Sequence, residues 1–293
     1  MVYVQDIYGR PLMPTTRHGK VRRLLKSKKA TVVNLCPFTI RLLYDTTGYK
    51  QEITLGVDTG TKHVGLSATT KSKELYASEV ILRSDVVDLL STRRELRKIR
   101  RYRLRYRKPR FMNRIKSKKR GWIAPSIRQK IDSHIRIIGF VYSILPVSKL
   151  IIEVAQFDTQ NVKMTFGYIT KYNRINHGIE KSHVSDAFVI SRNFDSERLG
   201  YYYKRKLVRR HNRQIHKMKA PKGGNKRMNQ SPFKVFGFRL FDKVMFQGKE
   251  RFIYARRLRG IFNIRDINGE NKKDISYKKL EYVSHGLISI VAG

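Results

Sequence analysis

Three acidic residues stand where the surrounding sequence predicts a folded core, in a chain with few acidic side chains. Asp58 ends the apolar run ITLGVDTG, Glu153 ends KLIIEV, and Asp186 lies within SHVSDAFVISRN. Burying a carboxylate costs free energy unless the group is paired with a cation or binds a metal ion. The pattern therefore predicts one site assembled from two strand ends and one helix.

These residue types suit metal-dependent phosphodiester hydrolysis. Carboxylate oxygens are the ligands that hard divalent cations prefer, so we expect Asp58, Glu153 and Asp186 to hold two Mg²⁺ ions, with Mn²⁺ as an alternative. Two such ions about 3.5–4 Å apart can activate a water molecule and stabilise the leaving 3′-oxygen. His183 precedes Asp186 by one helical turn and is expected to act as general base or to orient the water. The alternative for each acid is a helix cap or a salt bridge to one of the many arginines.

The elements that position these residues follow from apolar patterning. Runs 53–60, 63–70 and 74–82 predict a meander of three strands, and 148–154 predicts a buried strand. Gly56 and Gly60, on either side of Asp58, allow backbone or phosphate to approach closely.

Two helices complete this group of elements. Residues 182–193 predict a helix capped by Ser182, and residues 126–145 predict an amphipathic helix with Ser126 as cap. The predicted apolar stripe of the second helix consists of Ile127, Ile131, Ile135 and Ile138.

The charge balance predicts a polyanionic partner. The 293 residues include 64 Lys and Arg against 22 Asp and Glu, a formal net charge of +42, and self-repulsion at that charge is costly. A single cysteine, Cys36, excludes a disulfide framework and a multi-cysteine zinc site. The apolar region 137–155 is interrupted by Pro146 and Lys149, which argues against a membrane span, and no signal peptide is evident. The expected compartment is a reducing cytosol.

Residues 86–108 predict a long helix that is unusually basic. Eleven of the eighteen residues from 93 to 110 are basic: Arg93, Arg94, Arg97, Lys98, Arg100, Arg101, Arg103, Arg105, Arg107, Lys108 and Arg110. Like charges four residues apart destabilise a free helix, so we expect phosphates to lie along it. The alternative is a solvated run of charge. A second basic segment contains Arg209, Arg210, His211, Arg213 and His216, for which we favour contacts with an RNA backbone over a zinc site.

The two ends of the chain predict smaller units. Residues 1–50 predict a basic module with a short helix, packed through Val21, Leu24 and Leu25, and strands at 31–35 and 38–44. Short alternating strands within 233–283 predict a small β-barrel. Trp122 is expected to anchor a core, and at least one of Tyr201, Tyr202 and Tyr203 is expected to pack inward because three consecutive residues cannot share one strand face.

Taken in order, these motifs resemble a known nuclease family. VDTG after one strand, IEVA on another and HxxDA opening a helix look like the three parts of a RuvC-type nuclease, and the arginine-rich helix looks like the bridge helix of RNA-guided nucleases. Segments 9–33, 152–160, 165–188 and 208–217 resemble the transposon-encoded IscB family, the first of them its N-terminal PLMP module. IscB proteins carry an HNH domain between the second and third RuvC parts. Here DTQNVKMT (158–165) joins those parts directly, so the chain resembles the HNH-less relative IsrB or an IscB from which that domain was removed.

The resemblance implies an α/β fold class: an RNase H-like (RuvC) mixed-sheet core split in sequence, an arginine-rich bridge helix, a PLMP-like α+β module and a C-terminal small β-barrel. The implied divisions are PLMP-like module 1–50, RuvC part I 51–84, bridge helix and basic loop 85–125, RuvC part II 126–160, RuvC part III 161–199, and RNA-contacting segment with β-barrel 200–293.

The implied function is an RNA-guided DNA nickase that cuts the displaced non-target strand. Its partners would be a guide ω-RNA, one protein per RNA, and double-stranded DNA with an adjacent motif, in a prokaryotic cytoplasm near the nucleoid and away from membranes. Two alternatives stay open: a guided DNA-binding scaffold without cleavage, and an unguided RuvC-type junction nuclease.

Overall fold

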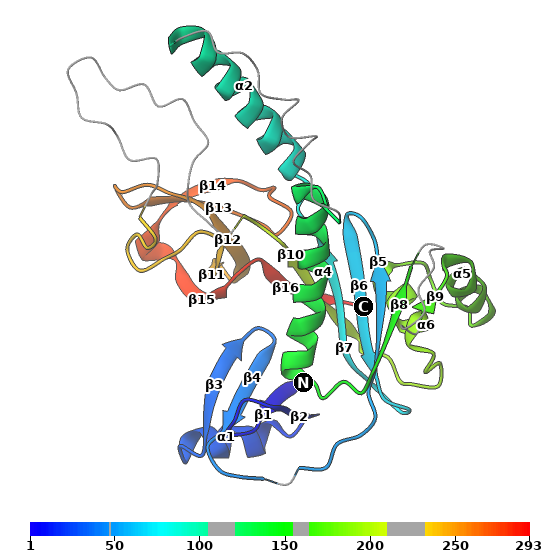
Figure 1. Ribbon diagram of the computed structural model, residues 1–293. Coiled ribbons are helices and arrows are strands. Elements are labelled where there is room, and N and C mark those ends of the chain that lie inside the picture. Colours follow the sequence, from blue (N-terminus) through cyan, green and yellow to red (C-terminus); the bar gives the residue numbers. More distant parts are fainter. Residues whose placement is uncertain (47, 105–120, 155–163, 210–231) are drawn as a thin grey trace.

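The computed structural model describes residues 1–46, 48–104, 121–154, 164–209 and 232–293. In those residues the chain is a mixed α/β protein with three sheets and five α-helices. Figure 1 shows the seven-stranded sheet beside helix α4, the N-terminal sheet below it, and the C-terminal sheet to one side. No helix in the described part of the chain is long and apolar enough to cross a membrane.

The N-terminal sheet has the strand order β2-β1-β4-β3 and is covered by helix α1, His18–Lys26. Its strands are β1 Val2–Gln5, β2 Pro11–Thr15, β3 Ala30–Leu35 and β4 Phe38–Leu42. Val21 is buried and Leu24 and Leu25 pack against the same cluster, so the predicted helix stripe is confirmed. Sequence patterning missed β1, which lies in the middle of this sheet.

The seven-stranded sheet has the order β16-β10-β7-β6-β5-β8-β9. The strands β5, β6 and β7 form the predicted antiparallel meander, and β8 runs parallel to β5, followed by β9. The bounds are β5 Thr54–Thr59, β6 His63–Thr69, β7 Glu74–Ile81, β8 Lys149–Glu153, β9 Met164–Thr165, β10 Tyr201–Lys206 and β16 Ile288–Ala292.

The two faces of this sheet differ because side chains alternate along each strand. Leu55 and Val57 belong to the main hydrophobic core together with residues of α4, Pro125–Ile144. The opposite face carries Gly56 and Asp58 and is covered by α6, His183–Ser191. Polar chemistry therefore lies on the α6 side, while the α4 side supplies the apolar packing.

Helix α4 differs from the prediction both in its N-cap and in the residues that it buries. Ala124 is the N-cap and Pro125 the first helical residue, so Ser126 is not the cap, which fits the preference of proline for the first helical turn. The buried residues are Ser133, Ile137, Val141 and Ile144. Ile127, Ile131 and Ile135 are exposed because they lie on a different face of the helix from the buried stripe, and Ile138 is partly buried against the main core.

Trp122, just before this helix, was expected to anchor a core and is instead about half exposed, with 52% of its surface accessible. The residues of α4 that join the main hydrophobic core begin at Ile137, well after Trp122 in the sequence.

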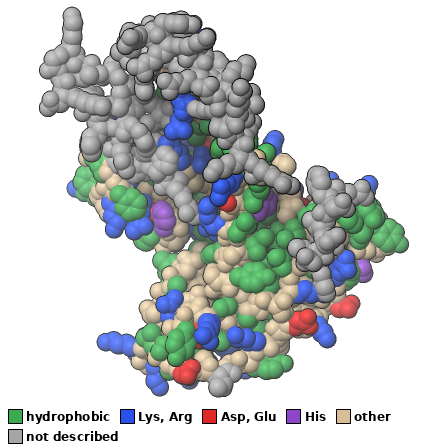
Figure 2. Space-filling model, viewed as in Figure 1, with side chains coloured by type: hydrophobic (Ala, Val, Ile, Leu, Met, Phe, Trp, Pro, Cys, Tyr) green, Lys and Arg blue, Asp and Glu red, His purple; other side chains and the backbone are tan. Residues whose placement is uncertain are grey.

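Helix α2, Val86–Leu104, is the predicted basic helix as far as the described residues extend. Arg93, Arg94, Arg97 and Lys98 are exposed along it. The side chains of Arg100, Arg101 and Arg103, and all of Arg105, Arg107, Lys108 and Arg110, lie outside what the structure describes. Figure 2 shows Lys and Arg side chains at many places on the visible face and Asp and Glu at few.

The predicted C-terminal β-barrel is wrong. Five antiparallel strands form an open sheet in the order β14-β13-β12-β11-β15, and its edge strands β14 and β15 do not pair. A barrel needs its first and last strands to pair. The next strand, β16, leaves to pair with β10 in the seven-stranded sheet. The bounds are β11 Asp242–Phe246, β12 Lys249–Arg256, β13 Ile261–Arg265, β14 Lys273–Ser276, η1 Tyr277–Lys279 and β15 Glu281–His285.

Residues 201–206, where patterning predicts only basic chain, form strand β10 of the seven-stranded sheet. Tyr203 is the inward-facing tyrosine, 3% exposed and stacked on Tyr76 with ring centroids 5.5 Å apart. The sixfold division of the chain predicted from the sequence stays a prediction.

Candidate active site

The three predicted carboxylates come from adjacent elements of the seven-stranded sheet and from the helix above it. Asp58 lies near the end of β5, Glu153 ends the neighbouring strand β8, and Asp186 lies in the first turn of α6. The carboxyl ends of two parallel neighbours meet at one edge of a sheet. This topology explains how residues nearly a hundred positions apart in sequence reach one place.

Helix α6 lies directly against this part of the sheet because two strand glycines leave room for its backbone. A Cβ atom on Gly65 would lie 1.8 Å from the carbonyl oxygen of His183, and one on Gly56 would lie 2.1 Å from that of Ala187. The close approach predicted at Gly56 is thus made by helix backbone. Ser182 caps the helix as predicted, its hydroxyl accepting a hydrogen bond from the backbone N–H of Ser185.

His183 and Asp58 form a hydrogen-bonded pair across the sheet–helix interface. Nδ1 of His183 lies 2.7 Å from Oδ2 of Asp58. A carboxylate only accepts, so Nδ1–H is the donor, and in the neutral imidazole Nε2 keeps its lone pair. The histidine side chain is 43% exposed, whereas that of Asp58 is 14% exposed. Asp58 therefore holds the imidazole ring of His183 through Nδ1, and the ring presents its basic Nε2 toward solvent.

Glu153 is held from two sides. The hydroxyl of Thr170 donates to Oε2 of Glu153 at 2.8 Å, and that of Thr59 donates to its backbone carbonyl at 2.5 Å. Burial raises the pKa of Glu153, the Thr170 hydrogen bond opposes the rise, and the charges of Asp58 and Asp186 add to it. Asp58 and Asp186 therefore lie close enough to Glu153 for their negative charges to oppose its ionisation.

Asp186 has a cationic neighbour that the sequence did not reveal. Nε of Arg174 lies 3.1 Å from Oδ1 of Asp186, with both side chains largely buried. Burial and the charge of Asp58 raise the pKa of Asp186, while Arg174, His183 and Lys181 oppose that rise. The salt-bridge alternative raised for the acids thus holds for Asp186 in this arrangement.

Thr170 and Arg174 both belong to helix α5, Gly167–Asn176, which the sequence patterning did not predict. They are four residues apart and therefore share one face of the helix. That spacing, just ahead of the HxxDA motif, is the signal that could have identified them.

The donor set fits a hard divalent cation in its chemistry. All three acids offer carboxylate oxygens, and their mutual repulsion is the charge pattern that a bound cation would relieve. In the described residues, however, no group of three His, Cys, Asp or Glu side chains is gathered as a metal cage. Each carboxylate instead contacts a different neighbour: His183, Thr170 or Arg174.

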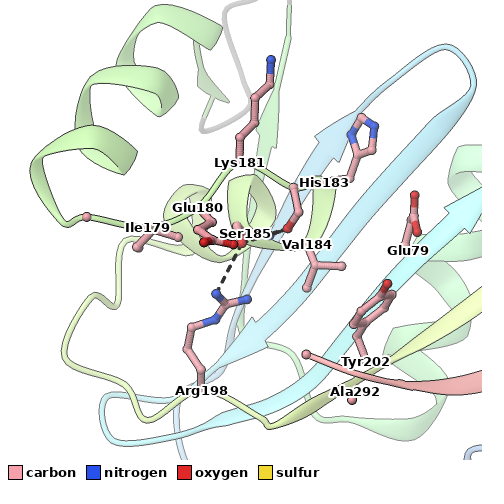
Figure 3. A pocket seen from close by; sticks show the side chains of 13 residues that line it. Glu79, Ile179, Glu180, Lys181, His183, Val184, Ser185, Arg198, Tyr202 and Ala292 are labelled. Carbon is pink, nitrogen blue, oxygen red and sulfur yellow. Dashed lines mark hydrogen bonds between the residues drawn. The ribbon is translucent and has the colours of Figure 1, made fainter.

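A pocket of about 640 Å³ opens beside this cluster. It is lined by the first turn of α6 and by Glu79, Lys181, Arg198 and Tyr202. Figure 3 shows Arg198 reaching toward Ser185, to whose hydroxyl it donates a hydrogen bond of 3.3 Å. His183 lines the pocket, so the ring that bonds Asp58 can be reached from it.

The predicted nucleic-acid contacts are described only in part. Arg93, Arg94, Arg97 and Lys98 lie exposed on α2, and Arg209 is partly buried. Arg210, His211, Arg213 and His216 lie outside the described residues, as does the segment 155–163 between β8 and β9.

Fold and cluster together define a mixed α/β protein with three carboxylates and a histidine at one edge of its largest sheet. The RRXRR protein family matches residues 2–174, more than half of the chain. The chain therefore belongs to the RRXRR protein family. The matched region contains Asp58, Glu153 and Arg174 and ends before His183. No curated protein matches this chain.

Proposed function

We propose that this protein is an RNA-guided DNA endonuclease that nicks one strand through a RuvC-type centre. The observation that carries the proposal is the convergence of Asp58, Glu153 and Asp186, with His183, on one edge of the seven-stranded sheet. The RRXRR family is associated with nucleases of the IscB and HNH kind, which supports the class of activity.

The sheet order supports an RNase H-like core. Along β7-β6-β5-β8-β9, three antiparallel strands are followed by two that run parallel to β5. An RNase H-like nuclease uses acids at these strand ends and on a covering helix, as Asp58, Glu153 and Asp186 are arranged here. The shape of the sheet and the position of the acids thus agree.

Asp58, Glu153 and Asp186 would hold two Mg²⁺ ions, or Mn²⁺ in their place. Bound cations would supply charge neutralisation for the phosphodiester and favour ionisation of the attacking water. Among the protein's own side chains, His183 handles the proton of the attacking water. With Nδ1–H donated to Asp58, Nε2 accepts a proton from the water that attacks phosphorus, while the P–O3′ bond breaks.

The nucleic-acid partners follow from charge. A net charge of +42 needs many phosphates nearby, and Arg93, Arg94, Arg97 and Lys98, all exposed on α2, offer cations to an RNA backbone. We propose one guide ω-RNA per protein and a double-stranded DNA target with an adjacent motif, in a prokaryotic cytoplasm near the nucleoid. Base pairing with the guide would select the target.

The single nuclease centre sets the product. The sequence between the second and third RuvC-like parts contains no His-Asn-His pattern with paired cysteines. One centre cuts one strand, so we propose that the displaced non-target strand is nicked and the paired strand stays intact.

Co-purification and nicking test this proposal together. The protein is purified from cells that also express the noncoding DNA flanking its gene, the bound RNA is sequenced, and the complex is incubated with Mg²⁺ and a supercoiled target library. A discrete RNA with open-circle product supports the proposal. RNA without nicking would favour the binding scaffold, and cleavage without RNA would favour the junction nuclease.

A further inference from the structure

A second histidine, His63 at the start of β6, stacks on His183. The two ring centroids are 5.1 Å apart, and the planes differ by 7°. Such a near-parallel stack restricts rotation of the ring that it covers, and aromatic pairs of this kind contribute beyond the area they bury. His63 belongs to the strand beneath the helix, so it contacts His183 from a rigid element.

His63 is itself held by an acid on the next strand. Its Nδ1 lies 2.7 Å from Oε1 of Glu79, whose side chain is 17% exposed. Glu79 lies opposite Gly65 in the β6–β7 pairing, so it is a diagonal neighbour of His63 on the same face of the sheet. One patch of the sheet therefore places Gly65 against the backbone of His183 and His63 against its ring.

We propose that His63, through the stack of its ring on His183, is a positioning residue that holds the imidazole of His183 in the orientation that donates Nδ1–H to Asp58. The role parallels the outer partners of metal-site histidines, which fix tautomer and ring plane. His63 acts through His183 and has no part in the chemical step. This inference rests on the proposed function only for its effect on nicking. The stack of His63 on His183 is formed within the protein itself and does not depend on that function.

The test compares His63→Ala, which removes the stack, with His63→Phe, which keeps an aromatic ring but loses the bond to Glu79. His134→Ala is the control, since His134 lies on α4 and, among the described residues, hydrogen-bonds the carbonyl of Lys130 in its own helix. Thermal unfolding first establishes that each variant is folded.

The first measurement needs no nucleic acid or metal. In protein labelled with ¹⁵N-histidine, we expect His183 in wild type and His63→Phe to be the Nδ1–H tautomer. In His63→Ala we expect a mixture of tautomers. An unchanged His183 signal in folded His63→Ala overturns the inference, whether or not the protein nicks DNA.

The second measurement is nicking kinetics with the guided complex. His63→Ala should lower kcat about 10- to 100-fold with KM for DNA unchanged, as outer-shell changes commonly do, and His63→Phe should recover most of the rate. A His63→Phe enzyme as slow as His63→Ala would contradict positioning by stacking. If wild type shows the ordered tautomer and its loss in His63→Ala but never nicks, the proposed function fails and the positioning role stands.

Discussion

Nε of Arg174 lies 3.1 Å from Oδ1 of Asp186, so a guanidinium already neutralises one of the three clustered carboxylates. The same arginine donates from Nη1 to the carbonyl of Ile179 at 3.3 Å, which holds it in the connection between α5 and α6. A cation bound at Asp186 must therefore compete with Arg174 or share the carboxylate with it.

Removing this competitor should tighten metal binding. We predict that Arg174→Ala lowers the Mg²⁺ concentration for half-saturation of the nucleic-acid-free protein about two- to five-fold, equivalent to ~0.4–1 kcal/mol. Arg174→Lys keeps the charge and should change it less. Calorimetric titration with Mg²⁺ measures the effect, and equal or weaker binding by the alanine variant would contradict this competition.

The glycine under α6 should be essential for stability. Gly65→Ala places a methyl group on the carbonyl of His183, which is backbone and cannot swing aside. We predict a loss of about 1–3 kcal/mol or more in the free energy of unfolding. Gly139→Ala, in α4 with nothing within 4 Å of the added atom, should instead stabilise by roughly 0.5–1 kcal/mol. Urea unfolding compares them, and equal effects would contradict the close packing of α6.

Buried Glu74 should impose a pH dependence on stability. Its side chain is fully buried and accepts hydrogen bonds from Ser67 at 2.5 Å and from the N–H of Leu199 at 3.0 Å, with Arg198 3.9 Å away. Burial raises the pKa of Glu74 despite these contacts. A raised folded-state pKa means that the native state holds the proton more tightly than the unfolded chain does. Stability therefore falls as pH rises from the unfolded value of about 4.3 through the folded value.

Glu74→Gln mimics the protonated acid and removes that loss. We predict similar stability of variant and wild type below about pH 4, and a difference that shifts in favour of the variant as pH rises. Chemical unfolding at a series of pH values tests this. A difference independent of pH would show that Glu74 does not titrate abnormally.

The exposed cations of α2 should account for part of the salt dependence of RNA binding. Replacing Arg93, Arg94, Arg97 and Lys98 by alanine should reduce the slope of log affinity against log salt by about 3, since each phosphate contact contributes ~0.7–0.9. Replacing the three arginines by lysine keeps the charge and should leave the slope nearly unchanged. Binding of the co-purified RNA at several salt concentrations measures both, and an unchanged slope in the alanine variant would place the RNA elsewhere.

The sequence predicted the elements that carry the acids, because each acid follows or interrupts an apolar run whose period is clear. The strands that carry Asp58 and Glu153, and the helix capped by Ser182, formed as expected. Patterning did not find Arg174 or His63, because their roles depend on which elements pack together. It misjudged α4, whose Ile127–Ile135 stripe is regular but lies on a face of the helix other than the buried one.

One side of the seven-stranded sheet was also beyond prediction. Strand β10 is rich in tyrosine and basic residues, and Tyr203 is buried because β10 pairs between β7 and β16 and packs against the main core. The barrel prediction failed for the same reason, because the edge strands β14 and β15 of the five-stranded sheet do not pair with each other. In both cases the outcome depends on which strands pair across long distances in the sequence. The local alternation of polar and apolar residues carries no information about that pairing.

The central claim is tested most directly by strand-resolved cleavage. A target duplex labelled on each strand in turn is incubated with the guided complex and Mg²⁺, using wild type, Asp58→Asn, Glu153→Gln and Asp186→Asn. We predict a cut in the non-target strand alone, slowed about 100-fold or more in each variant, beyond the usual range for outer-shell changes, with DNA binding retained. Cleavage of both strands, or a wild-type rate in any of the three variants, would contradict a single nuclease centre built on these carboxylates.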